Sequence, residues 1–98
     1  MQLQRQYNVL LIGDSCTDEW AYGSCDRLSP EAPIPVMKFR EHQSAPGMAA
    51  NVNENLKSLG INVNFLTNRE KIVKTRYVDE KSNQQIMRLD TEPDIKPL

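Results

Sequence analysis

Two carboxylates stand close together early in the chain. Asp14 follows the apolar run at residues 9–12, and Asp18 comes four residues later. Open α/β sheets bind ligands beyond the carboxyl ends of their strands. Two carboxylates at such a place can accept hydrogen bonds from adjacent hydroxyl groups, which is how a polyol is held. The structural alternative is that Asp14 caps a turn and Asp18 is solvated, and the pair alone favours neither interpretation.

A second polar feature is the predicted start of a helix in the segment P-G-M-A-A-N, residues 46–51. The free N–H groups of a first helical turn suit a polar or anionic ligand. Gly47 would let that ligand approach the backbone closely, and Asn51 offers both a donor and an acceptor. The same small residues also suit close packing of a helix on a sheet, and the two roles are compatible.

Basic and amide side chains recur in the second half of the chain. Lys74 and Arg76 share one face of a predicted strand because strand side chains alternate, and Gln85 and Arg88 lie on the next strand. Lys74 and Arg76 could contact a phosphorylated ligand. The alternative is an exposed, solvated strand face.

Charge and cysteine content exclude several classes of function. The formal net charge is −1, and the interleaved charges form no basic face for a nucleic acid. Cys16 and Cys25 are too few for a disulfide scaffold and have no metal-ligand spacing, and we assign no chemistry to them or to His42. No signal core precedes the run at 9–12, which is far too short to cross a membrane. We therefore expect a soluble cytoplasmic protein that binds no metal, nucleic acid or membrane.

The glycines restrict the chemistry further. The sequence contains neither GxxxxGK[ST] nor GxGxxG, and the last of its glycines is Gly60. A glycine-built anion hole in the second half is therefore impossible. Phosphoryl transfer depends on such positioning and charge stabilisation, so we predict no catalytic residue.

The elements that position these residues are predicted to form an α/β structure. Residues 7–12 are predicted to form a strand. Its last four residues, 9–12, are all apolar, which is typical of a parallel strand covered on both faces. Residues 17–23 and 34–40 read as extended, and the prolines between them predict an edge or a protruding flap. Residues 62–66 form a further predicted strand, and residues 71–78 and 84–89 a hairpin around the turn at 79–83.

The helix predicted over residues 49–59 is the clearest element. Ala49, Val52, Leu56 and Leu59 fall on one face at spacings of three and four. Gly60 stands where a left-handed C-cap belongs.

Several segments together resemble one family. V-L-L-I-G-D (9–14) followed by Asp18 resembles the first strand of the ribokinase-like (PfkB) carbohydrate kinases. R-L-S-P-E-A-P-I-P-V (27–36) after Tyr22-Gly23 resembles the heptose-phosphate kinase branch, the kinase half of the bifunctional heptose kinase/ADP-heptose synthase. P-G-M-A-A-N-V (46–52) resembles the Gly-Gly-Ala-Ala-Asn helix of that branch. K-T-R-Y (74–77) and R-L-D (88–90) resemble its later lid strands.

The resemblance implies a partial ribokinase-like parallel sheet with a helix and a small β lid. It implies a single truncated domain over residues 1–92 and a homodimer through the lid strands. Two prolines in the tail at 93–98 predict that this tail is flexible. Asp14 and Asp18 would bind sugar hydroxyls, and Gly47 and Asn51 would hold the sugar from the helix start. Lys74 and Arg76 would reach the phosphate of a sugar phosphate such as D-glycero-D-manno-heptose 7-phosphate, a lipopolysaccharide precursor.

Departures from the family pattern shape the expected activity. Met48 replaces the second glycine at the helix start, and residues 67–70 stand where a full βα unit is normal. The family's Gly-Ala-Gly-Asp portion, with the catalytic base and most of the ATP site, is missing.

The expected function is therefore that of a truncated kinase, which binds a sugar phosphate but does not phosphorylate it alone. ATP and magnesium would belong to the full-length family only. The alternatives are a non-enzymatic dimerisation or partner-binding module derived from the lid, and a residual fragment without a role.

Overall fold

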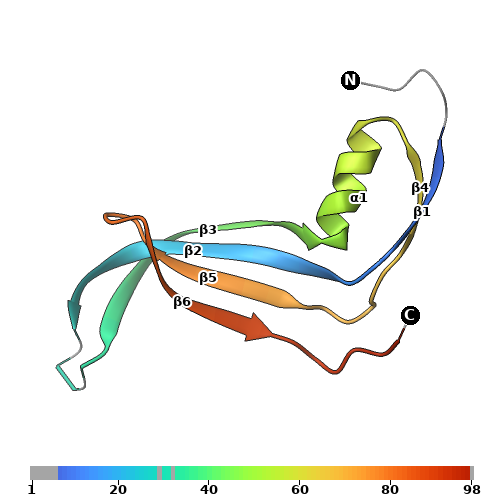
Figure 1. Cartoon of the computed structure of the whole chain (residues 1–98). Coiled ribbons are helices and arrows are strands. Elements are labelled where there is room, and N and C mark those ends of the chain that lie inside the picture. Colours follow the sequence, from blue (N-terminus) through green and yellow to red (C-terminus); the bar gives the residue numbers. More distant parts are fainter. Residues whose placement is uncertain (1–6, 29, 32, 98) are drawn as a thin grey trace.

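The computed structural model describes residues 7–28, 30–31 and 33–97. Within these residues, six strands and one helix follow one another (Figure 1). They are β1 (Asn8–Ile12), β2 (Ser15–Leu28), β3 (Pro35–Met48), α1 (Ala49–Ser58), β4 (Asn62–Leu66), β5 (Val73–Asp79) and β6 (Gln84–Thr91).

β1 and β4 form a parallel pair, as expected for strands that flank a crossover. Val9 and Leu11 lie opposite Val63 and Phe65, and these four side chains are half-buried. Because α1 packs against one face of the pair (Figure 1), we assign the half-buried side chains to that face. The other face of the pair is exposed. The prediction that residues 9–12 are covered on both faces is therefore wrong for this chain, because nothing among the described residues packs on the second face.

The other strands form a four-stranded sheet in the order β3-β2-β5-β6. β2 runs antiparallel to β3 and parallel to β5, and β5 and β6 form the predicted hairpin. β2 and β3 are each 14 residues long, far longer than the predicted runs at 17–23 and 34–40, because their ladder continues through two register shifts. β3 is an edge strand, which explains how it accommodates Pro35 and Pro46.

The helix is confirmed: α1 begins at Ala49 as predicted and ends at Ser58, and Gly60 adopts the predicted left-handed conformation with φ 79. Pro46 and Gly47, which precede the helix, belong to the end of β3. Val52 is 44% exposed, whereas Asn53 is only 7% exposed. The side that docks against the strands is thus rotated from the predicted apolar face, and the buried Oδ1 atom of Asn53 has no hydrogen-bond partner in the described chain.

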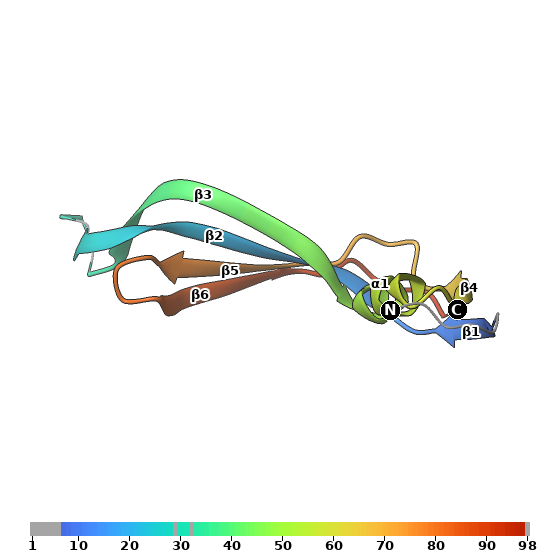
Figure 2. The same cartoon turned by 90° about the horizontal axis from the view of Figure 1, so that it is seen from above.

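The buried apolar side chains are few and small. Among the described residues they are Cys16, Ala21, Ile72 and Val78, and no large side chain is fully buried. The molecule is a thin, elongated plate of 61 × 34 × 15 Å, with the four-stranded sheet extending away from α1 and the parallel pair (Figure 2). The predicted α/β class with a parallel sheet, one helix and a second sheet is confirmed. α1 is too short to span a membrane, and the described residues contain no other helix.

Candidate functional site

An ion pair stands at the centre of one face of the four-stranded sheet. Asp18 on β2 accepts a hydrogen bond through Oδ1 from Nη1 of Arg76 on β5, at 3.1 Å. The Arg76 guanidinium also lies over the Trp20 ring, 5.6 Å from its centroid. Alternation puts Asp18 and Trp20 on the same face of β2, and Trp20 faces Arg76 in the register. Carboxylate and aromatic ring together fix the orientation of the guanidinium.

Gly47 borders this ion pair from the third strand. It lies opposite Cys16 in the β2–β3 register. A Cβ atom at Gly47 would stand 2.5 Å from Oδ2 of Asp18 and 2.6 Å from Sγ of Cys16, so only glycine leaves the Asp18 carboxylate its present position. The structure thus brings Asp18, Gly47 and Arg76 together from three strands.

Further charges continue the same face toward β6. Lys74 lies opposite Asp18 on one side and opposite Asp90 on the other. Arg88 donates a hydrogen bond to Asp90 at 2.8 Å, which lowers the pKa of the Asp90 carboxyl. Across β2, β5 and β6 this face therefore carries three cations, Lys74, Arg76 and Arg88, against the two carboxylates of Asp18 and Asp90.

Two predicted site residues do not join this cluster. Asp14 is exposed, and its side chain makes no hydrogen bond or ion pair with the described residues; its backbone oxygen instead accepts the amide hydrogen of Ala49 at 3.0 Å. Asn51 is exposed on the first turn of α1. Both lie at the helix start and leave their polar groups open to solvent.

Three members of the cluster were not predicted as site residues. Trp20 follows Asp18 by two positions, and the same alternation that paired Lys74 with Arg76 would have placed it on the carboxylate's face. Arg88 and Asp90 depend on the β5–β6 register, which the turn residues predict only approximately.

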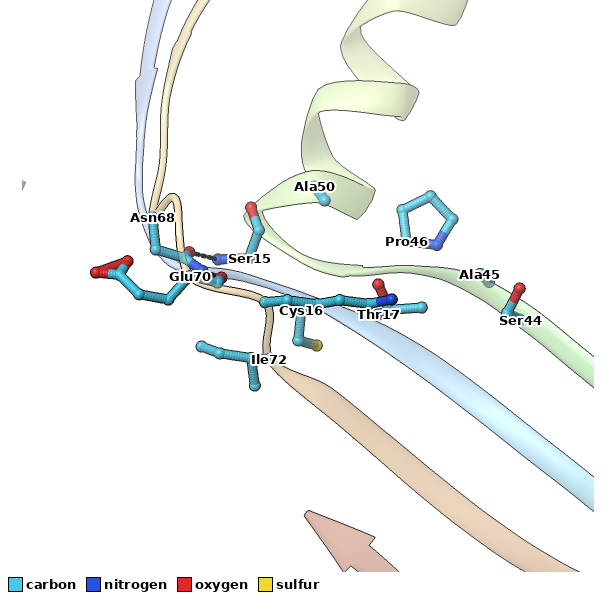
Figure 3. A pocket seen from close by; sticks show the side chains of 11 residues that line it. Ser15, Cys16, Thr17, Ser44, Ala45, Pro46, Ala50, Asn68, Glu70 and Ile72 are labelled. Atoms are coloured by element: carbon cyan, nitrogen blue, oxygen red, sulfur yellow. Dashed lines mark hydrogen bonds between the residues drawn. The ribbon is translucent and has the colours of Figure 1, made fainter. Parts of the chain in front are cut away.

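A hollow of about 370 Å³ lies nearby, where β2, β3 and the segment between β4 and β5 meet (Figure 3). Asn68 closes part of it by accepting the amide hydrogen of Ser15 at 2.6 Å. The predicted site residues do not line this hollow. Their cluster lies instead on an open sheet face, so a ligand there would be covered on one side only.

Cys16 lies beside the cluster but is unsuited to nucleophilic chemistry. Burial raises the pKa of its thiol, and the neighbouring Asp18 carboxylate raises that pKa further. The thiolate is the reactive form, so this environment keeps Cys16 inert at neutral pH.

Sequence comparisons identify relatives that share long stretches with the chain. No family model matches. The chain is 35% identical to the bifunctional protein HldE of Campylobacter fetus over 87% of its length. It is 31% identical to the bifunctional protein HldE of Campylobacter curvus over 96% of its length. The second alignment extends over 123 residues, more than the 98 of this chain, so that relative has residues without a counterpart here. The chain spans only 24% and 26% of these two proteins.

A solved structure supports the same relationship at the level of the fold. A carbohydrate kinase from Agrobacterium tumefaciens superposes on 87% of the chain with a TM-score of 0.53, at 11% sequence identity. The chain covers 35% of that kinase. The chain is thus related, over most of its length, to the heptose-phosphate kinase branch of the ribokinase-like (PfkB) carbohydrate kinases.

Proposed function

We propose that this chain is a kinase-derived module that binds a sugar phosphate of the heptose 7-phosphate class and does not transfer phosphate by itself. The observation that carries the proposal is the meeting of Asp18, Gly47 and Arg76, from β2, β3 and β5, on one face of the four-stranded sheet. The family resemblance supplies the sugar class, and the geometry supplies groups that suit it.

The Asp18 carboxylate can accept hydrogen bonds from the hydroxyl groups of a sugar. Its side chain is 23% exposed, and Arg76 holds it through Oδ1. Oδ2 lies against Gly47 and makes no hydrogen bond with the described residues. A sugar hydroxyl could therefore donate to Oδ2 without breaking the ion pair, and Asp14 and Asn51 would hold the sugar from the helix start.

The phosphate would lie nearer to β5 and β6. Lys74 and Arg76 project from the same strand face. Together with Arg88 they exceed the carboxylates of Asp18 and Asp90 by one positive charge across β2, β5 and β6. An Arg guanidinium binds phosphate oxygens in a bidentate manner. The open sheet face offers no enclosing group to shield a transferring phosphoryl group from water, which fits binding without catalysis.

Binding and catalysis are tested separately. Isothermal titration with heptose 7-phosphate should give saturable binding, weakened about tenfold or more by Asp18→Asn, because an amide presents its oxygen less effectively to a hydroxyl donor. Asp26→Asn, an exposed position remote in the sheet, is the matched control and should bind normally. Equal affinities for both variants would remove Asp18 from the site.

With ATP, magnesium and the sugar phosphate present, the pure chain should release no ADP above background. Clear turnover would contradict the non-catalytic part of the proposal while leaving the binding part intact. A cytoplasmic location belongs to the same proposal, and the two free cysteines fit a reducing compartment.

A second candidate function, self-association, is favoured by the opposite face of the sheet. A groove of about 590 Å³ there is lined by apolar side chains that include Phe39, Tyr77 and Met87. Phe39 is 61% and Met87 53% exposed. If this face forms a homodimer, Phe39→Asp should convert a dimer to a monomer in size-exclusion light scattering. A wild-type monomer would leave sugar binding as the only candidate.

A further inference from the structure

Two arginines stand directly opposite each other on β5 and β6. Arg76 and Arg88 are partners in the register of this antiparallel pair. Side chains opposite each other in a sheet lie on one face, with Cβ atoms about 4.5–5.5 Å apart, and like charges in that position repel. The neighbouring row of the sheet has the opposite arrangement, because Lys74 lies between Asp18 and Asp90. One row thus balances its own charge, whereas the row of the two arginines does not.

Each arginine is held by a carboxylate of the neighbouring row. Arg76 donates through Nη1 to Asp18 at 3.1 Å, and Arg88 donates through Nη2 to Asp90 at 2.8 Å. The other nitrogen atoms of both guanidinium groups make no hydrogen bond with the described residues. The Arg88 side chain is 48% exposed and the Arg76 side chain 27% exposed. Both guanidinium groups therefore keep hydrogen-bond donors within reach of a ligand on the open face.

The negative charge around Arg88 comes from three carboxylates. Asp90 raises the pKa of the Arg88 guanidinium most, and Glu92 and Asp18 raise it further. Asp90 in turn has a lowered pKa, chiefly because Arg88 donates a hydrogen bond to it. Within the described chain, Asp90 is the only one of the three that accepts a hydrogen bond from Arg88. It is therefore the group that a ligand anion must displace to reach this arginine.

We propose that Arg76 and Arg88 bind one phosphomonoester dianion between them, and that Asp90 holds Arg88 until this phosphate displaces it. The inference rests on the proposed function, since the phosphate is that of the bound sugar phosphate. A dianion can accept hydrogen bonds from two guanidinium groups at once, whereas the Asp90 carboxylate offers one charge to one of them. Lys74 already lies between two carboxylates, so it adds charge to the face while Arg88 is the second direct ligand of the phosphate.

The arrangement gives this face a preference for a ligand that carries a phosphate group. A neutral sugar brings no charge between the two guanidinium groups, so it leaves their repulsion unchanged. A phosphate relieves that repulsion and takes up the donors that the ion pairs leave unused. Asp90 opposes binding because it competes for Arg88. Loss of Arg88 must therefore weaken phosphate binding, and loss of the Asp90 charge must strengthen it.

The test measures binding of inorganic phosphate and, separately, of heptose 7-phosphate by phosphorus NMR titration at low ionic strength. Arg88→Gln should lower the affinity for both ligands about tenfold, because hydrogen bonds to a charged partner are worth more than neutral ones. Asp90→Asn should raise both affinities about threefold or more, since Arg88 is then released from an exposed ion pair. A gain in affinity cannot arise from a variant that fails to fold.

Two substitutions are the matched controls. Glu92→Gln removes the same charge as Asp90→Asn, but the exposed Glu92 side chain makes no hydrogen bond to Arg88, so the affinity should change less than about twofold. Arg40→Gln breaks a comparable ion pair with Glu80 elsewhere in the chain and should bind phosphate as the wild type does.

The outcomes separate this inference from the proposed function. If heptose 7-phosphate binds and Arg88→Gln binds it equally well, the inference is wrong and sugar-phosphate binding stands. Equal gains with Asp90→Asn and Glu92→Gln would also overturn it, because total charge and not displacement of Asp90 would then decide the affinity. If inorganic phosphate binds through Arg88 but heptose 7-phosphate binds no tighter, the paired arginines are a phosphate site and the sugar part of the proposed function fails. Absence of phosphate binding by the wild type would overturn both.

Discussion

Met48 has a backbone conformation that suits glycine. Its φ is 56 and its ψ −130 at the N-cap of α1. A side chain in such a conformation costs about 1–3 kcal/mol of strain. Met48 is 48% exposed, so burial of its side chain offsets little of this strain energy. Met48→Gly should therefore raise the free energy of unfolding by about 1 kcal/mol, after the greater backbone freedom of unfolded glycine is subtracted. Urea unfolding measures the change.

Met48→Ala is the matched control for strain. It removes most of the side chain but keeps the Cβ atom, so it should bring no such gain. A gain of equal size with alanine would locate the problem in the side chain and not in the backbone.

At the level of single residues, sequence reasoning succeeded where the two-residue period of a strand decides the outcome. The alternation predicts that Lys74 and Arg76 share one face of their strand, and the structure has them on one face; it did not predict the contact between Arg76 and Asp18. Sequence reasoning failed where three-dimensional docking decides. Val52 has the better helical spacing for a core residue, yet Asn53 faces the strands, and no local signal carries the orientation of α1 against β3 and β4.

At the level of elements, the junction between the two sheets depends on a few polar contacts. Asn68 follows β4 and accepts the amide hydrogen of Ser15 at 2.6 Å, while its Nδ2 donates to the backbone oxygen of Glu70 at 2.7 Å. Thr67 adds a hydroxyl contact to Ser15 at 2.6 Å. The short segment 67–70 thereby connects the parallel pair to β5 without an additional helix. The sequence predicted the brevity of this connection but not the side chains that hold it.

Asn68→Ala should lower the free energy of unfolding by about 1–3 kcal/mol, because it leaves partly buried backbone groups without partners. Asn64→Ala is the control in β4: the Asn64 side chain is exposed, and the change should stay within about 0.5 kcal/mol. Equal losses for both variants in chemical unfolding would show that the junction gains nothing specific from Asn68.

The segment after β6 is attached to this junction by a contact that depends on pH. The Glu70 carboxylate accepts the amide hydrogen of Lys96 at 3.0 Å, and this bond lowers the pKa of Glu70 from its ordinary value of 4.5. A depressed carboxyl pKa stabilises the folded form above the unfolded pKa, and the effect is lost as pH falls through the folded value. Protection of the Lys96 amide in hydrogen exchange should therefore disappear in acid. In Glu70→Gln that pH dependence should vanish, and its persistence would assign the protection to another contact.

At the level of the whole molecule, the chain exposes more surface than a compact protein of its size. Its radius of gyration is 18.3 Å, against about 13 Å for a compact chain of this length. Its accessible surface is 7482 Å², against about 5,700 Å² for a compact monomer of this mass. The composition does not predict this excess surface, because the apolar content is an ordinary 39%. The exposure of the apolar side chains follows from the tertiary arrangement alone.

This excess surface leads to a prediction about stability and concentration. If the apolar groove around Phe39 associates with a second copy, folding is coupled to association, and the thermal midpoint must rise with protein concentration. Raising the concentration about a hundredfold should increase the wild-type midpoint by several degrees, because mass action then adds roughly 2–3 kcal/mol to the free energy of unfolding of each dimer. Scanning calorimetry at two concentrations measures the shift. Phe39→Asp should have a lower midpoint that no longer depends on concentration, whereas Leu10→Asp should behave like the wild type because it alters the parallel pair only. A wild-type midpoint that stays constant would contradict self-association through this groove and would mean that the surface remains uncovered in the isolated chain.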